Sequence, residues 1–137
     1  GLGDVYKRQE RDLAVRLKLS PQKSVVSGKR IVLVDDSIVR GTTSAKLIKR
    51  MRKAGAKEVH FRVTSPPFMY PCYYGVDTPD RKKLIAANLD IEEIRKQIGA
   101  DSLEFIDLDS MLKLVENPDN YCKACFTGDY PVKKDEI

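Results

Sequence analysis

Several kinds of segment are missing from this sequence, and each absence excludes a class of protein. No apolar run approaches the roughly 20 residues that a membrane-spanning helix needs. We find no signal peptide. The lysines and arginines are scattered, without the long basic block or the aromatic platform that binds nucleic acid. We therefore expect a cytoplasmic protein that contacts neither membrane nor nucleic acid, and whose net charge of +5 suits small anionic ligands.

Two common phosphate-binding motifs and a disulfide framework are also missing. The sequence contains neither G-x-x-x-x-G-K-[ST] nor the dinucleotide-binding pattern G-x-G-x-x-G. It has three cysteines, which is an odd number, and a single histidine, His60. In a cytoplasmic protein such a set indicates metal or redox chemistry rather than paired disulfides.

What is present is the composition of one folded domain. With 42% hydrophobic and 33% charged residues, a chain of 137 residues is typical of a globular protein that buries a core. Residues 1–9 fit no element that follows, and "DVYKRQ" resembles the translated end of a transposon adapter, so we exclude them. A natural frayed terminus is the alternative. We expect the domain over 10–108 and a cysteine-bearing C-terminal tail over 109–137.

Hydrophobic patterning predicts that strands and helices alternate. A short strand over 16–20 precedes the β-branched run 29–36, which suits a strand covered on both faces. A helix capped by Thr42 or Thr43 leads to a second strand over 57–65, so these two strands should be parallel. A structured, proline-rich loop follows. Beyond it we expect helices over 78–87, 91–98 and 109–116 and a strand over 102–108.

The segment "IVLVDDSIVRGTT", residues 31–43, carries the most chemistry. Asp35 and Asp36 end a strand, at the edge where α/β sheets bind ligands. The loop after them offers backbone N–H groups, hydroxyls and a guanidinium, and it leads into a helix N-terminus that favours anions. Carboxylates accept hydrogen bonds from a sugar diol or hold Mg²⁺. The combination indicates a ribose 5-phosphate, while a solvated acidic turn and a plain helix cap remain the alternatives.

This segment resembles the phosphoribosylpyrophosphate (PRPP) motif of type I phosphoribosyltransferases. Together with "AGAKEVHFRVTSPP", "YPCYYGVDTPDRKKLIAAN", "IEEIRKQIGADSLEFI" and "YCKACFTGDYP", it is similar to the C-terminal part of the glutamine PRPP amidotransferases, over about residues 10–132. The resemblance implies an α/β fold, containing part of the parallel, Rossmann-like sheet of a type I phosphoribosyltransferase domain. It also implies a helical, cysteine-bearing C-terminal tail.

The same resemblance implies a reaction and its binding residues. The family transfers phosphoribosyl from PRPP to glutamine-derived ammonia, giving 5-phosphoribosylamine in the first step of de novo purine biosynthesis. Asp35 and Asp36 would contact the ribose hydroxyls and Mg²⁺, and the loop after them would hold the 5-phosphate. Displacement at C1 needs positioning more than a protein nucleophile, so we expect no catalytic residue in this chain. The residues assigned to PRPP are Asp35, Asp36, Ser37, Arg40, Gly41, Thr42 and Thr43.

The cysteines form a second candidate site. Cys122 and Cys125 make a C-x-x-C pair, and thiolates at this spacing, with Cys72, suit zinc or an iron–sulfur cluster. Alternatives are a buried free thiol at Cys72, a redox dithiol for the pair, and a Cys₃His zinc site that includes His60. The resemblance to cluster-bearing family members implies a [4Fe–4S] cluster on all three cysteines, with its fourth ligand upstream of this chain.

The resemblance finally implies partners and a limit. Full-length family members are homotetramers that use PRPP and glutamine and are inhibited by purine nucleotides. Their glutaminase uses an N-terminal cysteine, whereas the first cysteine here is Cys72, so we expect this chain to be inactive alone. Two rival interpretations are another type I phosphoribosyltransferase, such as a purine-salvage or regulatory homologue, and a non-catalytic zinc-binding module.

Overall fold

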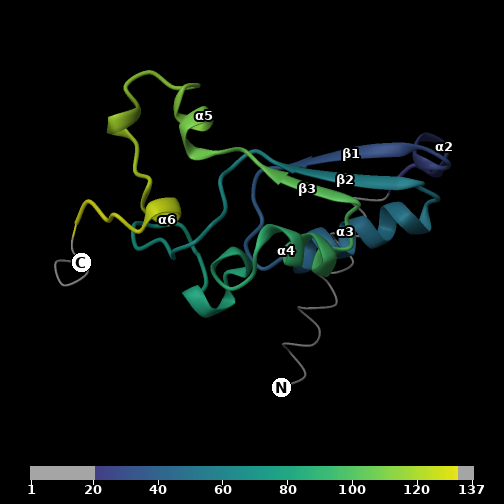
Figure 1. Ribbon diagram of the computed structural model, residues 1–137, viewed down its shortest axis with the longest axis horizontal. Helices are drawn as coiled ribbons and strands as arrows, with labels where there is room; N and C mark the ends of the chain where they lie inside the picture. The colour runs from purple at the N-terminus through teal and green to yellow at the C-terminus, as the bar shows by residue number, and fades with distance from the viewer. Residues whose placement is uncertain (1–20, 133–137) are drawn as a thin grey trace.

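A parallel sheet in the order β1-β2-β3 forms the centre of the fold (Figure 1). Its strands are β1 (Arg30–Asp35), β2 (Glu58–Val63) and β3 (Ser102–Phe105). The computed structural model describes residues 21–132, so the excluded segment 1–9 and the strand predicted over 16–20 lie outside the described residues. The parallel strands with intervening helices confirm the α/β class.

The predicted strand–helix–strand unit is confirmed. Helix α3 (Thr42–Lys53) connects β1 to β2, and the two strands pair in parallel with Leu33 opposite Phe61. The threonine cap is wrong: the N-cap residue is Gly41, and the two threonines occupy the first turn of the helix instead. Gly41 takes this place because the chain turns there with a φ of 74°, a left-handed conformation that glycine adopts without strain.

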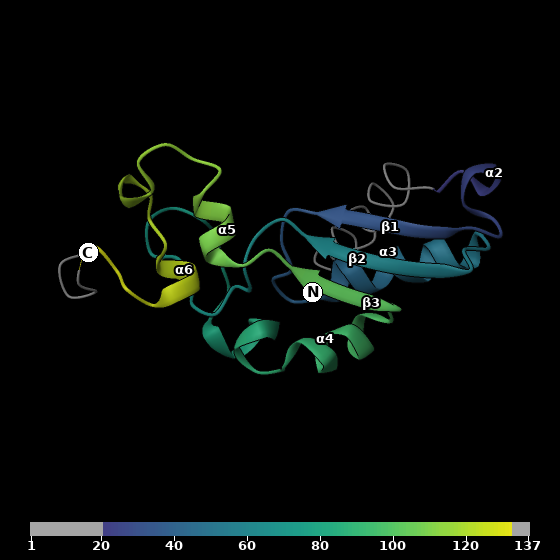
Figure 2. The same ribbon diagram turned by 45° about the horizontal axis from the view of Figure 1, so that its top comes forward.

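Within residues 21–132, helices cover one face of the sheet. Helices α3 and α4 (Ile91–Ile98) lie on the same side of the strands (Figures 1 and 2). Inward-facing side chains such as Phe61 are fully buried there, whereas Val32 and Val34 on the other face of β1 are 62% and 67% exposed. The prediction that β1 is covered on both faces is therefore wrong for the described residues, because no described helix packs on that second face.

Helix α4 begins and ends as the sequence predicts. The Asp90 carboxylate accepts the Glu93 N–H at 2.8 Å, and the Glu93 carboxylate accepts the Asp90 N–H at 2.9 Å, which completes a capping box. Gly99 ends the helix with a φ of 80°. Ile94 and Ile98 face the core, so α4 closes the layer beside α3.

The helix predicted over 78–87 is wrong. The chain instead forms two short 3₁₀ turns, η1 (Arg81–Lys83) and η2 (Ile85–Ala87), on either side of an extended residue, Leu84. Leu84 and the next two residues are all buried. A surface α-helix cannot bury three consecutive side chains. Burial of these residues in the core therefore prevents the helix that the local sequence favours. Asn88 replaces the lost backbone bonds by donating its side-chain N–H to the Leu84 carbonyl at 2.7 Å.

The C-terminal tail packs against the proline-rich loop (Figure 2). Its α5 starts one residue before the predicted range because Asp107, rather than a later residue, caps the Ser110 N–H at 2.8 Å. The Cys125 carbonyl accepts the N–H groups of Met69 and Tyr70 at 3.0 and 3.1 Å, so tail and loop share backbone hydrogen bonds. The remaining short elements are α2 (Lys23–Val26), α5 (Leu108–Leu112), η3 (Pro118–Asn120) and α6 (Ala124–Thr127).

None of the helices within residues 21–132 has the length and apolar character needed to cross a membrane.

Candidate functional site

The loop between β1 and α3 forms one wall of a cavity of about 420 Å³. Every residue predicted to bind a sugar phosphate lies in its lining, so one place holds them all. They are Asp35, Asp36, Ser37, Arg40, Gly41, Thr42 and Thr43. Val39, Ser44, Asp77 and Pro79 complete the lining.

Asp77 and Pro79 line the cavity but are not among the residues predicted from the sequence to bind a ligand. Both belong to the proline-rich loop after β2, which runs to the same cavity as the loop after β1. A signal was available. Parallel strands carry their ligand-binding loops at one shared edge of the sheet, so the loop after the neighbouring strand was a candidate for the opposite wall.

The strand ends between the two carboxylates. The Asp35 carbonyl still accepts the Thr64 N–H at 2.9 Å, which continues the pairing of β1 with β2. The next N–H, that of Asp36, donates instead to the Asp35 carboxylate at 3.0 Å, and the Ser37 hydroxyl donates to the Asp36 carboxylate at 3.0 Å. A regular strand would send the two side chains to opposite faces. Because the chain turns here, both line the same cavity.

The cavity gathers more negative than positive side-chain charge. Burial raises the pKa of the Asp35 carboxyl above its ordinary value. The hydrogen bond from the Asp36 N–H lowers this pKa, and the negative charge of Asp36 raises it further. Asp77 brings a third carboxylate, and Arg40 is the one cationic side chain among the lining residues that the structure describes. A cation or several hydroxyl donors would relieve this repulsion.

The donor set suits magnesium better than a metal held by protein alone. Within residues 21–132, no three histidine, cysteine, aspartate or glutamate side chains group closely enough to hold a metal ion. Mg²⁺ usually takes one or two carboxylates and completes its octahedron with water and substrate phosphate oxygens. Asp35 and Asp36 fit that pattern.

The far end of the loop offers an anion site. The N-cap residue of α3 is Gly41, which has no side chain to accept the N–H groups of the first turn. Those donors and the positive end of the helix dipole favour an anion, and the Thr42 and Thr43 hydroxyls lie beside them. Carboxylates at one end and an uncapped helix N-terminus at the other match a ribose 5-phosphate, which has a diol and a phosphate.

The core holds this loop in place. Ile38 is 1% exposed, and the Val39 carbonyl accepts the Ile85 N–H at 2.9 Å. A Cβ atom on Gly41 would lie 2.7 Å from Ile85 Cδ1, so any larger residue here would require the buried Ile85 side chain to shift. The anion site is therefore positioned by tertiary packing and not only by its own sequence.

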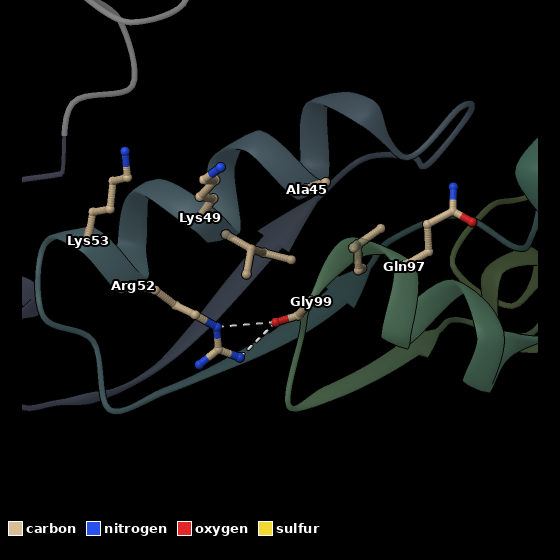
Figure 3. A pocket seen from close by; sticks show the side chains of 8 residues that line it. Ala45, Lys49, Arg52, Lys53, Gln97 and Gly99 are labelled. Atoms are coloured by element: carbon tan, nitrogen blue, oxygen red, sulfur yellow. Dashed lines mark hydrogen bonds between the residues drawn. The ribbon is translucent and has the colours of Figure 1, made fainter.

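A second cavity of about 560 Å³ lies between α3 and the end of α4 (Figure 3). Arg52 reaches across it and donates to the Gly99 carbonyl at 2.7 and 3.3 Å. Lys49, Lys53 and Gln97 also line it, over an aliphatic floor. Its lining has no carboxylate and no hydroxyl, so it lacks the groups that bind a sugar diol or a magnesium ion.

The cysteines come from separate segments that the tail brings into one neighbourhood. Burial raises the pKa of the Cys125 thiol; a backbone hydrogen bond opposes this, and the nearby Cys122 and Cys72 thiols raise it further. All three are free thiols. The backbone hydrogen bonds from Met69 and Tyr70 to the Cys125 carbonyl place the tail beside the proline-rich loop that carries Cys72. The thiols nevertheless do not form a ready-made group of metal ligands in the described part of the chain.

His60 takes no part in that neighbourhood. Its ring nitrogens lie 2.8 Å from the Ser102 hydroxyl and 2.9 Å from a Glu58 carboxylate oxygen, within the sheet. Its neighbours Val59 and Phe61 point inward, as the sequence predicts for an ordinary strand residue. The Cys₃His zinc alternative is therefore wrong for the described residues.

A parallel α/β sheet, with an acidic strand end and an uncapped helix N-terminus at its carboxyl edge, is typical of one class of protein. The fold is that of a type I phosphoribosyltransferase domain, of which the described residues contain a 3-stranded sheet.

Comparisons with known proteins show what the chain is similar to within that class. The chain is 56% identical, over 93% of its length, to amidophosphoribosyltransferase 1, chloroplastic, of Arabidopsis thaliana. It is 56% identical, over 92% of its length, to the amidophosphoribosyltransferase of Methanocaldococcus jannaschii. No family model matches the chain.

A solved structure gives the same result. The glutamine PRPP amidotransferase from B. subtilis, complexed with ADP and GMP, superposes with a TM-score of 0.77 at 46% identity, covering 86% of this chain and 28% of that one. This chain spans only 23% and 26% of the two curated relatives, about a quarter of their length. It therefore resembles one segment of the amidophosphoribosyltransferases in sequence and fold.

Proposed function

We propose that this chain carries the ribose 5-phosphate side of the PRPP site of an amidophosphoribosyltransferase. The enzyme would transfer phosphoribosyl from PRPP to glutamine-derived ammonia, giving 5-phosphoribosylamine in the first step of de novo purine biosynthesis. One observation carries the proposal: the acidic strand end and the uncapped N-terminus of α3 line the same cavity. A ligand with a diol at one end and a phosphate at the other complements that lining.

Each lining group has a role in this proposal. Asp35 and Asp36 would accept hydrogen bonds from the ribose hydroxyls and would be the residues that hold Mg²⁺. The first-turn N–H groups of α3, with the hydroxyls of Thr42 and Thr43, hold the 5-phosphate. Ser37 orients the Asp36 carboxylate through its 3.0 Å hydrogen bond, so that one of its lone pairs is already committed.

The proposed displacement at C1 requires that the sugar be held in a fixed orientation. The bond from C1 to pyrophosphate breaks, the bond from ammonia nitrogen to C1 forms, and the nitrogen loses a proton. Bound Mg²⁺ would neutralise charge on the leaving pyrophosphate. The side chains of this chain fix the sugar at its hydroxyls and its phosphate, which orients C1 toward the nucleophile. Acidic groups near the ring also stabilise the positive charge that develops on it.

The proposal also includes a cofactor, regulators and an assembly. Cys72, Cys122 and Cys125 would hold a [4Fe–4S] cluster with a fourth cysteine from elsewhere, supported by their shared neighbourhood. Purine nucleotides would act as feedback inhibitors, supported by the ADP and GMP complex of the B. subtilis protein. Glutamine as nitrogen donor and a homotetramer complete the proposal. Iron and sulfide analysis of anaerobically purified protein tests the cluster.

The proposal extends to the cellular location of the protein. We propose a cytoplasmic enzyme, the location expected from the sequence. The plant relatives are named chloroplastic, so a plastid is the alternative. Fluorescence imaging of the tagged protein in its source cells distinguishes the two compartments.

Calorimetric titration of the chain with PRPP and Mg²⁺ tests the site. Binding should require Mg²⁺, and Asp36→Asn should weaken it by about 10- to 100-fold, as expected for the loss of charge-assisted contacts. Asp80→Asn is the matched control, because Asp80 is an exposed carboxylate outside the cavity lining. The proposal fails if wild-type protein does not bind, or if the Asp80 variant loses as much affinity as the Asp36 variant.

A further inference from the structure

The loop between β2 and η1 touches two parts of the molecule at once. On one side, Asp77 and Pro79 line the cavity beside the β1 loop. On the other side, the N–H groups of Met69 and Tyr70 donate to the Cys125 carbonyl in the tail. The loop therefore lies between the cysteine-bearing tail and the cavity.

One hydrogen bond joins the two sides of this loop. The Cys72 N–H donates to the Thr78 hydroxyl oxygen at 2.6 Å. Thr78 stands between the two lining residues, Asp77 and Pro79. Among the described residues, no other hydrogen bond or ion pair fastens these three residues. The short bond is thus the specific polar contact that locates this wall of the cavity.

The tail in turn locates Cys72. The Tyr130 hydroxyl donates to the Pro71 carbonyl at 2.7 Å, on one side of Cys72. On its other side, the Tyr73 ring packs on the Tyr130 ring with centroids 5.0 Å apart. The Tyr74 hydroxyl donates to the Val132 carbonyl at 2.9 Å. Contacts with the tail on both sides of Cys72 hold its N–H in position for Thr78.

We propose that Thr78 is a positioning residue of the cavity, which accepts the Cys72 N–H and thereby holds Asp77 and Pro79 in the cavity wall. Through this bond, the order of the tail is transmitted to the site. The identity of the ligand rests on the proposed function, but the Cys72–Thr78 hydrogen bond, here called the tether, does not. Asp77 needs a fixed position because its carboxylate can accept hydrogen bonds from ligand hydroxyls or from water on a bound cation.

Two substitutions separate the hydrogen bond from the shape of the side chain. Thr78→Val keeps the volume but removes the acceptor, whereas Thr78→Ser keeps the acceptor. Thr78→Ala removes the acceptor with less bulk and replaces the valine variant if that variant does not fold. All are made in the full chain, without ligand for the first measurement.

Amide hydrogen exchange reads the tether directly. In Thr78→Val the Cys72 N–H should exchange about 3- to 10-fold faster, the range expected for the loss of one hydrogen bond. Thr78→Ser should match wild type, and the amides of α4 should not change in any variant. Unchanged protection of the Cys72 amide in Thr78→Val, or equal loss in Thr78→Ser, would overturn the proposal.

Calorimetric binding of PRPP with Mg²⁺ reads the consequence. Thr78→Val should bind about 3- to 10-fold more weakly, and Thr78→Ser should bind as wild type does. Wild-type affinity in Thr78→Val would overturn the positioning role. If wild-type protein does not bind PRPP at all, the proposed function fails, while the exchange measurement still decides whether the tether exists.

Discussion

At the scale of single residues, the binding role proposed for Asp35 comes at a cost to folding. Its carboxyl is partly buried next to the Asp36 charge, and burial raises its pKa above the ordinary value. For a carboxyl whose pKa is higher in the folded state, the stabilising contribution is complete below the unfolded-state pKa and is lost as the pH rises through the folded-state pKa. At neutral pH the ionised Asp35 therefore disfavours the empty folded state.

Asp35→Asn should consequently be more stable than wild type at neutral pH and fail to bind PRPP with Mg²⁺. Asparagine retains the side-chain oxygen that accepts the Asp36 N–H, so the turn is preserved. The gain in Tm should shrink as the pH falls and the wild-type carboxyl becomes protonated. Thermal melts of both proteins across acidic and neutral pH measure this. A variant less stable than wild type at neutral pH contradicts the role given to burial.

At the scale of elements, the turn from β1 into α3 depends on close packing against η2. Gly41 combines a φ of 74° with a Cβ position only 2.7 Å from Ile85 Cδ1. Gly28 supplies a matched control, because its φ of 73° is nearly the same but nothing lies within 4 Å of its Cβ position. The pair separates backbone strain from the packing of the anion loop.

Gly41→Ala should lower the free energy of unfolding by about 2–4 kcal/mol, through left-handed backbone strain plus overpacking. Gly28→Ala should lower it by about 1–2 kcal/mol, through backbone strain alone. Urea denaturation of both variants gives the two values. Equal losses would show that contact with η2 does not hold the loop.

The elements also show which features the sequence could predict. The helix over 91–98 forms as predicted, because its capping box of Asp90 and Glu93 is made within four consecutive residues. The two 3₁₀ turns around Leu84 could not be predicted, because they exist to bury residues against a core assembled from distant segments. Local bonding carries its own sequence signal, whereas burial is decided by the rest of the fold.

The candidate site divides in the same way. The β1 loop was predictable because its carboxylates, hydroxyls and glycine follow one another along the chain. Asp77 and Pro79 were missed because only the parallel pairing of β1 with β2 brings their loop to the same cavity. The hydrogen bond from Cys72 to Thr78 left no sequence signal, since either residue has many other acceptable partners in a loop.

At the scale of the whole molecule, three parts meet at one edge of the sheet. The β1 loop supplies the carboxylates and the anion site, the β2 loop supplies the opposite wall, and the tail packs behind that wall (Figure 1). The second cavity lies on another side, between α3 and the end of α4. We therefore expect PRPP to bind at the first cavity and to leave the second one unaffected.

An NMR titration of the full chain with PRPP and Mg²⁺ tests that claim most directly. The backbone amides of Ser37, Thr42, Thr43 and Asp77 should shift together with one affinity, and should shift less when Mg²⁺ is left out. The amides that line the second cavity, those of Lys49 and Gln97 among them, should stay in place. Shifts centred on the second cavity, or none at Thr42 and Thr43, would contradict the account.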